Sequence, residues 1–219
     1  MKGVILQHFT GVLGELQEKS IRNISSYARS IGAAYELLRG DVFRKGLTPP
    51  CQKLFMLDQT WDEYDMVVMM DTDMFAVKGL SLSVFTDISG TGLFVPFTDE
   101  VFGKCRRRHP TLCDANYAYW GGCQWRLPLA LRKKFRECIN EEDLKAFSGN
   151  FEDEGMMHRL AVLTKTKQDQ IPHSWSYCSY RPEVEKAHII HIRKKASMTG
   201  PRVEKIDNYR ALQSRGIIE

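Results

Sequence analysis

The most apolar stretch of the chain, residues 66–70 (MVVMM), runs directly into the acidic tripeptide Asp71-Thr72-Asp73. Five apolar residues without alternation predict a strand that is buried on both faces, as in the middle of an α/β sheet. In such sheets, ligands bind beyond the carboxyl ends of the strands. Because residues two apart in an extended chain point the same way, Asp71 and Asp73 can face one site. Two carboxylates there can hold a divalent cation, which can in turn hold a pyrophosphate.

Strand-like and helix-like segments alternate along the first half of the chain. This β-α-β-α-β order predicts a largely parallel sheet with helices on both faces. The polar stretch over residues 97–114 is expected to be a surface loop. No linker or repeat divides the 219 residues, so one domain spanning residues 1–219 is favoured. We expect strands over residues 3–9, 35–38, 66–70, 92–96 and 187–192, and helices over residues 14–31, 50–64, 128–138, 153–163 and 203–215.

Composition excludes several classes of protein. A net charge of +4 is too small to indicate nucleic-acid binding by itself. The six cysteines form no C-x-x-C pair, so a zinc ribbon is not expected, and reduced thiols in a cytosol-like compartment are the simplest interpretation. No run approaches about 18 apolar residues, so we expect no membrane-spanning helix. The first residues fit a β-strand better than a signal peptide, and we therefore expect a cytoplasmic protein.

A basic run, Arg106-Arg107-Arg108, lies in the expected surface loop. A solvated loop is a better explanation than a nucleic-acid site, because no stacking aromatic residues are interleaved with the arginines. The run could instead hold an acidic acceptor, or become ordered over a bound donor.

Lys53 and the pair Gly121-Gly122 are candidate substrate contacts, and each also has an ordinary structural explanation. Lys53 precedes the buried strand and could reach a phosphate as a point charge, although a solvated helix lysine is the simpler interpretation. The paired glycines would let the backbone approach a ligand, while the neighbouring Tyr119 and Trp120 could stack on a sugar. A β-turn beside core aromatic residues explains this segment equally well.

Two later segments carry ionisable candidates. Asp153 and Glu154 open a predicted helix, whose dipole stabilises carboxylates there. Their functional interpretation is contact with a sugar or a catalytic role. His188 and His191 lie three apart in a predicted strand and therefore point to opposite faces, so only one of them can serve a given metal. His191 precedes the basic run of residues 193–195, which suits an anion site, although a structural histidine beside a solvated basic run is the alternative.

Taken in order, these motifs resemble those of glycosyltransferases of the GT-A fold, especially the glycogenin and bacterial galactosyltransferase type. That family has a lysine-bearing helix, an apolar strand leading into D-x-D, an F-N-[SG]-G segment, a D-Q-x-x-[LM]-N segment and a final H-x-x-G-x-x-K-P-W motif. Trp120, Glu154 and His158 depart from this pattern, and K-P-W is absent. The chain is also similar to the N-terminal glycosyltransferase domain of a multidomain chlorella virus protein. The matching segments here are residues 53–55, 64–73, 119–122, 153–158 and 191–195.

The resemblance implies a metal-dependent enzyme that moves a hexose or deoxyhexose from a UDP-sugar to a glycan or glycoprotein acceptor, with retention. It implies a nucleotide-binding half over about residues 1–96 and a sugar- and acceptor-binding half over about residues 97–219. If a carboxylate acted as general base on the acceptor, inversion would follow. A viral origin would imply a host cytoplasm and further domains. The implied residues are Asp71, Asp73 and His191 for Mn²⁺ or Mg²⁺, Phe9, Thr10, Lys53, Asp71, Gly121, Gly122 and Lys194 for substrate, and Asp153 and Glu154 for catalysis.

Three other functions are compatible with parts of the sequence. A haloacid-dehalogenase-type phosphatase also has D-x-D after an apolar strand, but Phe75 stands where Thr or Val is usual, and that strand would be the first of its core. A nucleotidyltransferase needs basic residues in a Gly-rich loop after the first strand, and residues 10–14 have none. A catalytically inactive sugar-nucleotide-binding relative would keep the fold, although the joint presence of Asp71, Asp73 and His191 argues against it.

Overall fold

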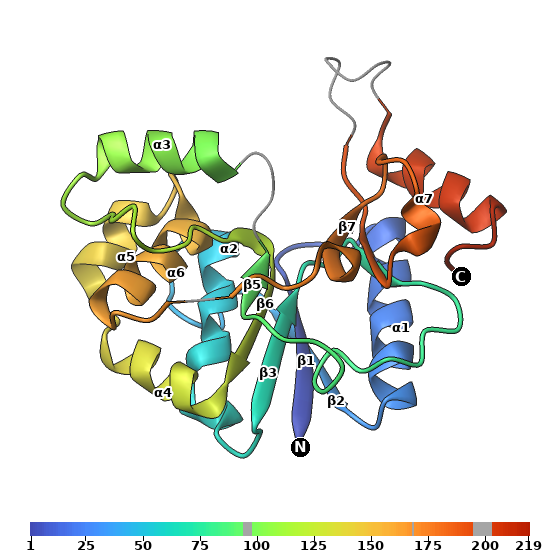
Figure 1. Cartoon of the computed structure of the whole chain (residues 1–219), viewed down its shortest axis with the longest axis horizontal. Helices are drawn as coiled ribbons and strands as arrows, with labels where there is room; N and C mark the ends of the chain where they lie inside the picture. Colours follow the sequence, from blue (N-terminus) through green and yellow to red (C-terminus); the bar gives the residue numbers. More distant parts are fainter. Residues whose placement is uncertain (94–97, 168, 195–202) are drawn as a thin grey trace.

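A five-stranded sheet forms the centre of the protein in a computed structural model, which describes residues 1–93, 98–167, 169–194 and 203–219 (Figure 1). The spatial order of the strands is β2-β1-β3-β6-β5. β1 is parallel to β2 and β3, whereas β6 runs antiparallel to its neighbours β3 and β5. The sheet is therefore mixed but mostly parallel, which confirms the predicted α/β class. Its strands are β1 (Gly3–Phe9), β2 (Ala34–Arg39), β3 (Met66–Met70), β5 (Gly92–Leu93) and β6 (Gly121–Pro128).

The central strand β3 is buried on both faces, as its apolar run predicts. Val67 and Met69 pack into the hydrophobic core on one side of the sheet, whereas Met66, Val68 and Met70 pack into the core on the other side. Apolar residues suit this position, because a buried polar side chain needs a hydrogen-bond partner inside the protein.

Helices cover both faces of the sheet (Figure 1). The buried residues of α1, among them Ile24, Tyr27 and Ala28, pack against one face of the sheet, and α7 lies beyond α1. The predicted helices over residues 14–31, 128–138, 153–163 and 203–215 are confirmed to within two residues. On the first side are α1 (Glu15–Ser30) and α7 (Lys205–Ser214), and on the other are α2 (Pro49–Gln52), α3 (Thr98–Arg108), α4 (Leu129–Glu137), α5 (Glu141–Phe147) and α6 (Glu152–Leu163).

A second, three-stranded sheet stands beside the carboxyl end of β3. Its order is β4-β8-β7, with β4 (Met74–Ala76) antiparallel to β8 (Ile189–His191) and β8 parallel to β7 (Tyr177–Cys178). Phe75 and Ile190 join this sheet to α7, where the Phe75 ring lies 5.0 Å from that of Tyr209. The tripeptide between β3 and β4 therefore passes from one sheet to the other.

Two predicted elements are wrong. Residues 98–108, expected to belong to a loop, form α3, whose residues Val101, Phe102 and Cys105 pack against the core. The helix expected over residues 50–64 is broken, because Asp58 adopts an extended conformation and accepts a hydrogen bond from the amide of Thr60. The segment consists of α2 followed by the 3₁₀ helices η1 (Lys53–Leu57) and η2 (Gln59–Trp61); two more, η3 (His173–Ser176) and η4 (Val184–Lys186), occur later.

Two other strands differ in extent from the prediction. The strand expected over residues 92–96 begins as β5, and residues 94–97 lie outside the described part of the chain. The strand expected over residues 187–192 is the shorter β8.

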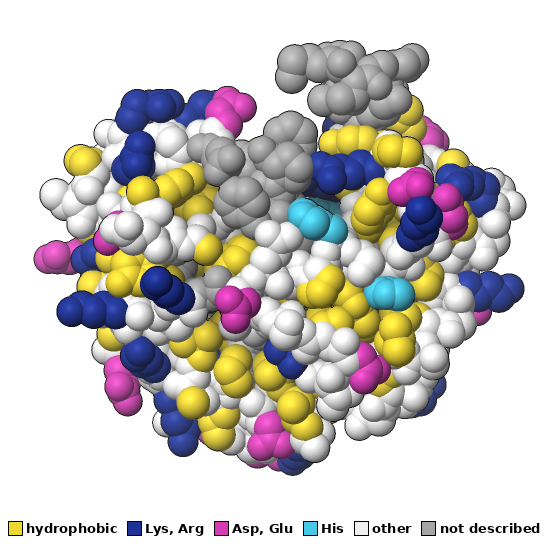
Figure 2. Space-filling model, in the orientation of Figure 1, with side chains coloured by type: hydrophobic (Ala, Val, Ile, Leu, Met, Phe, Trp, Pro, Cys, Tyr) yellow, Lys and Arg dark blue, Asp and Glu magenta, His cyan; other side chains and the backbone are white. Residues whose placement is uncertain are grey.

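The surface carries both signs of charge. In Figure 2, Lys and Arg side chains line the upper edge of the helical half, where Figure 1 draws α3, and acidic and basic side chains are interspersed over much of the remaining face. Arg106, Arg107 and Arg108 form the last turn of α3, where the helix dipole favours positive charge. No helix in the described ranges has both the length and the apolarity needed to cross a membrane.

Candidate active site

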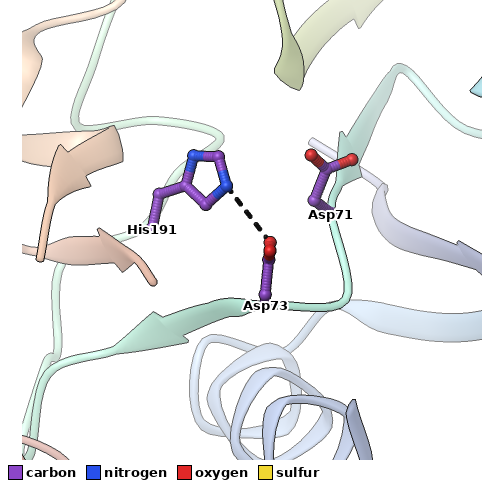
Figure 3. A group of neighbouring side chains, drawn as sticks. All are labelled: Asp71, Asp73 and His191. Atoms are coloured by element: carbon purple, nitrogen blue, oxygen red, sulfur yellow. Dashed lines mark ion pairs between the residues drawn. The ribbon is translucent and has the colours of Figure 1, made fainter. Parts of the chain in front are cut away.

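Asp71, Asp73 and His191 meet at the carboxyl end of β3 (Figure 3). Each offers a ligand atom, and these atoms lie within 4.8 Å of one another. Figure 3 shows the three side chains directed toward a common space, with His191 Nε2 3.2 Å from Asp73 Oδ1. Carboxylate oxygens suit Mg²⁺ and Mn²⁺, and an imidazole nitrogen is accepted by the softer Mn²⁺. The structure thus brings together the three residues that the resemblance of motifs implies as metal ligands.

The register of the small sheet explains why His191 is in this group. Met74 pairs with His191 across β4 and β8, and the amide of Ile192 donates a hydrogen bond of 2.8 Å to the Asp73 carbonyl. His188 lies outside the group, with its ring 5.1 Å from that of Trp175. One of the two histidines therefore joins the site, as strand alternation predicts.

Side chains from β1 and α1 hold the backbone of the acidic tripeptide. Gln7 Nε2 donates to the Asp71 carbonyl at 2.9 Å and to Ser20 Oγ at 3.1 Å, and Ser20 Oγ donates to the Met74 carbonyl at 2.7 Å. Gln7 and Ser20 are fully buried. The positions of both carboxylates are therefore fixed by hydrogen bonds to the main chain on either side of them.

Asp73 is paired with two basic groups. Burial alone would raise the pKa of its carboxyl, but His191 and Lys205 outweigh that effect and hold the pKa well below its usual range. Burial lowers the pKa of His191, and the Asp73 carboxylate more than compensates, raising the pKa to about 10. Lys205 Nζ reaches Asp73 Oδ2 from the first turn of α7. No sequence motif marks Lys205, because only the packing of α7 brings it to the tripeptide.

Lys53 occupies the centre of a second buried group. Its Nζ lies 2.9 Å from Asp71 Oδ1 and 2.5 Å from Asp153 Oδ2, and it donates a hydrogen bond of 2.6 Å to the Gly122 carbonyl. Burial lowers the pKa of Lys53, but the two carboxylates raise it by more, so the amine is charged. Lys53 Nζ donates hydrogen bonds to Asp71 Oδ1 and to the Gly122 carbonyl, and its contact with Asp153 Oδ2 is an ion pair. A phosphate would compete with these three partners for the ammonium group.

Asp153 and Glu154, in the first turn of α6, lie against the start of β6. Burial raises the pKa of Asp153 to about 7 despite Lys53, and Glu154 adds to the increase. Glu154 accepts a hydrogen bond of 2.8 Å from the Gly122 amide. A Cβ atom at Gly122 would lie 2.7 Å from Asp153 Oδ2. The sequence predicts that the backbone here lies close to a ligand, and in the structure it lies close to the Asp153 carboxylate.

A cavity of about 300 Å³ opens beside these groups. The predicted substrate residues Phe9, Thr10 and Lys194 are not part of its lining; Lys194 is exposed and pairs with Glu204 at 2.9 Å. A larger cavity, of about 470 Å³, lies between α1 and residues 76–80 and contains none of the predicted site residues. The buried ionisable groups place the candidate site at the smaller cavity. Its lining consists of Pro50, Lys53, Asp71, Val101, Gly121, Gly122, Cys123, Asn150, Phe151, Glu152, Asp153, Glu154, His191 and Arg193.

Comparison with solved structures finds a similar fold in several glycosyltransferases. A glycosyltransferase involved in the glycosylation of the major capsid of PBCV-1 has a TM-score of 0.56 and 12% identity, with 98% of this chain and 100% of that chain covered. The galactosyltransferase LgtC, solved with donor and acceptor sugar analogs, has a TM-score of 0.52 and 10% identity, covering 96% and 95% of the two chains. Mouse xyloside xylosyltransferase 1 has a TM-score of 0.50 and 11% identity, covering 92% and 99%.

Sequence comparison finds no matching family model and no matching curated protein. At identities of 10–12%, the structural likeness concerns the fold. The chain has the fold of the GT-A glycosyltransferases.

Proposed function

We propose that the protein is a divalent-metal-dependent glycosyltransferase that moves a hexose or deoxyhexose from a UDP-sugar to a glycan or glycoprotein acceptor, with retention. The observation that carries this proposal is the meeting of Asp71, Asp73 and His191 beside a cavity lined by Gly121, Gly122, Asp153 and Glu154. The fold shared with glycosyltransferases supports it. We expect the reaction to occur in the cytoplasm, with the nucleotide bound by residues 1–96 and the sugar and acceptor by residues 97–219.

The side chains of the cluster fit Mn²⁺ or Mg²⁺. Asp73 is ionised, and its two basic partners supply charge that a cation could replace. Asp73 and His191 would hold the cation directly, while Asp71 would divide its contacts between the cation and the ribose or sugar. When bound, the cation would neutralise the negative charge that develops on the departing UDP. Metal binding requires a neutral imidazole, so His191 would release its proton.

The remaining residues would position the donor. Phe9 is the last residue of β1 and Thr10 follows it, beside the carboxyl end of β3, and both would lie near the uracil. Lys53 and Lys194 would add positive charge near the diphosphate. Gly121 and Gly122 would border the donor sugar.

Asp153 and Glu154 are the proposed catalytic carboxylates. In a retaining reaction they would face the donor sugar and stabilise its developing positive charge. The raised pKa of Asp153 also suits proton transfer near neutral pH, and a general-base role on the acceptor would give inversion. The anomeric configuration of the product, read by NMR, distinguishes these two outcomes.

Melting temperatures test the proposal. We expect UDP to raise the melting temperature only when Mn²⁺ or Mg²⁺ is present. Asp73→Asn should abolish that shift, whereas Asp87→Asn, an exposed aspartate outside the cavity lining, should retain it. A screen for hydrolysis of UDP-glucose, UDP-galactose and UDP-rhamnose would then identify the sugar. Absence of any metal-dependent shift with all three donors would refute the proposal.

One observation favours a second candidate, a catalytically inactive relative that binds a sugar nucleotide without metal. The carboxylates of Asp71 and Asp73 are already compensated by Lys53, Lys205 and His191. This candidate predicts stabilisation by UDP alone and no donor hydrolysis. Release of phosphate from a generic phosphomonoester would instead indicate a phosphatase.

A further inference from the structure

Cys105 and Cys113 form a pair of thiols outside the candidate active site. Their Sγ atoms are 3.5 Å apart, and the two residues are eight positions apart in the chain. Cys105 is fully buried on α3, whereas Cys113 is partly exposed in the segment that follows this helix. The exposed member of the pair is the one that a small oxidant would reach first.

The two thiols share a hydrogen bond in which either sulfur can be the donor, and their acidities differ. The hydrogen bond between them lowers the pKa of Cys113 against the opposing effect of burial, and the side chains of His158 and His109 act in the same direction. The same hydrogen bond, together with burial, raises the pKa of Cys105. We therefore expect the more exposed thiol, Cys113, to supply the thiolate, which is the reactive form of cysteine.

We propose that Cys105 and Cys113 are a reversible oxidation site that closes to an intramolecular disulfide. A disulfide has an S–S distance of about 2 Å, so the sulfurs must approach by roughly 1.5 Å. In a reducing compartment such a disulfide is transient, which suits redox sensing rather than structural support.

A peroxide is the oxidant in this proposal. The Cys113 thiolate attacks one peroxide oxygen, the O–O bond breaks, and a sulfenic acid forms as hydroxide leaves. The Cys105 sulfur then attacks the sulfenic sulfur, an S–S bond forms, and the sulfenic oxygen leaves as water with the Cys105 proton. Two thiols are oxidised to one disulfide while the peroxide is reduced. A dithiol reductant restores both thiols by exchange.

The disulfide would fix α3 over the candidate cavity. Val101, which lines the cavity, lies one helical turn before Cys105. Phe102 packs on Tyr119 with ring centres 5.3 Å apart, and Tyr119 leads directly into Gly121 at the start of β6. Closing the pair would tie the helix to the segment that enters β6. An effect on donor binding rests on the proposed function, but formation of the disulfide does not.

Peptide mapping of the full chain tests the inference. Trypsin cleaves between the two cysteines after Arg106, Arg107 and Arg108, so their peptides stay joined only when the disulfide has formed. After treatment of the reduced protein with hydrogen peroxide, we expect a Cys105–Cys113 link that dithiothreitol removes. Cys113→Ser should abolish the link, and Cys138→Ser, a variant of another partly exposed free cysteine, should retain it.

Melting temperature supplies a measurement that does not depend on peptide mapping. Oxidation should raise the melting temperature of the wild-type chain, because the link restricts the unfolded state, and leave that of Cys113→Ser unchanged. A link from Cys113 to Cys123, which shares its tryptic peptide, or oxidation of Cys113 to sulfinic acid without a link would overturn the inference. Stoichiometric Zn²⁺ bound to the untreated protein and lost in Cys113→Ser would also overturn it.

Discussion

The Lys53 ammonium lies 2.5 Å from the Asp153 carboxylate, joining the segment before β3 to the first turn of α6. Both side chains are buried, and the same ammonium also lies 2.9 Å from Asp71. One cation therefore stabilises two carboxylates that approach it from different parts of the fold. The stability of the site and the charge state of its carboxylates depend on this one side chain.

Replacing Lys53 by Met should destabilise the protein by about 3–5 kcal/mol, because it leaves buried carboxylates without their cation. Lys104→Met is the matched control. Lys104 makes an exposed pair with Glu100, and its loss should change stability by no more than about 0.5 kcal/mol. Urea unfolding at pH 8 measures both differences. Equal stability of the two variants would show that the buried group does not depend on Lys53.

The raised pKa of Asp153 predicts a dependence of stability on pH. The pKa moves from an ordinary value of 3.8 to about 7 in the folded protein. Between these values the folded state retains a proton that the unfolded state has released, so the contribution of Asp153 to stability falls as the pH rises through this window. The slope is at most about 1.4 kcal/mol per pH unit. Urea unfolding of wild type and Asp153→Asn from pH 4 to 8 should show this slope only in the wild type; parallel profiles would contradict it.

Adding a methyl group at Gly122 should disturb the same ion pair. The new Cβ would lie 2.7 Å from Asp153 Oδ2, and we expect Gly122→Ala to lose about 1–3 kcal/mol of stability through overpacking. Gly103→Ala, within α3, is the control: the nearest atom to its new Cβ is 3.6 Å away, and alanine favours the helix. Thermal unfolding should therefore give a lower melting temperature for Gly122→Ala and an unchanged or higher one for Gly103→Ala. The reverse order would refute the close approach at Gly122.

Removing the Lys205 amine should strengthen metal binding to the proposed site. Lys205 pairs with an oxygen of Asp73 that a cation would need, so Lys205→Met should lower the dissociation constant for Mn²⁺ by several-fold in the absence of UDP. Lys194→Met removes a cation that pairs with Glu204 instead and should leave the constant nearly unchanged. Calorimetric titration with Mn²⁺ measures both. Weaker binding in Lys205→Met would show that the amine supports the cation rather than competing with it.

Much of the fold follows from local sequence pattern. The run over residues 66–70 identifies the central strand because both of its faces are buried. β6 is harder to recognise, because Gln124 and Arg126 interrupt its apolar residues. Arg126 is nevertheless buried, donating hydrogen bonds to the carbonyls of Val84, Phe85 and Gly90, and only the folded chain supplies those acceptors. α3 is also hard to recognise, because its apolar face is narrow and most of its residues are polar.

Only those residues of the candidate site that belong to recognisable motifs could be predicted from the sequence. The D-x-D and one histidine of the strand over residues 189–191 were identifiable in that way, and the structure places them together. Lys205 and the partnership of Lys53 with Asp153 depend on how α7 and α6 pack, which no local pattern encodes. The thiol pair was equally hidden, because the expected loop over residues 97–114 turned out to contain the helix that carries Cys105.

The acidic tripeptide connects β3 of the five-stranded sheet to β4 of the three-stranded sheet, and His191 belongs to β8 of the three-stranded sheet. The proposed metal ligands Asp71, Asp73 and His191 therefore lie where the two sheets meet. A cation bound by all three side chains would cross-link the two sheets. Filling the site would therefore stiffen β4 and β8 as well as supply charge, and amide exchange along these strands would slow with occupancy. Amide exchange in β4 and β8 would then measure how far the metal site is occupied before the sugar is transferred.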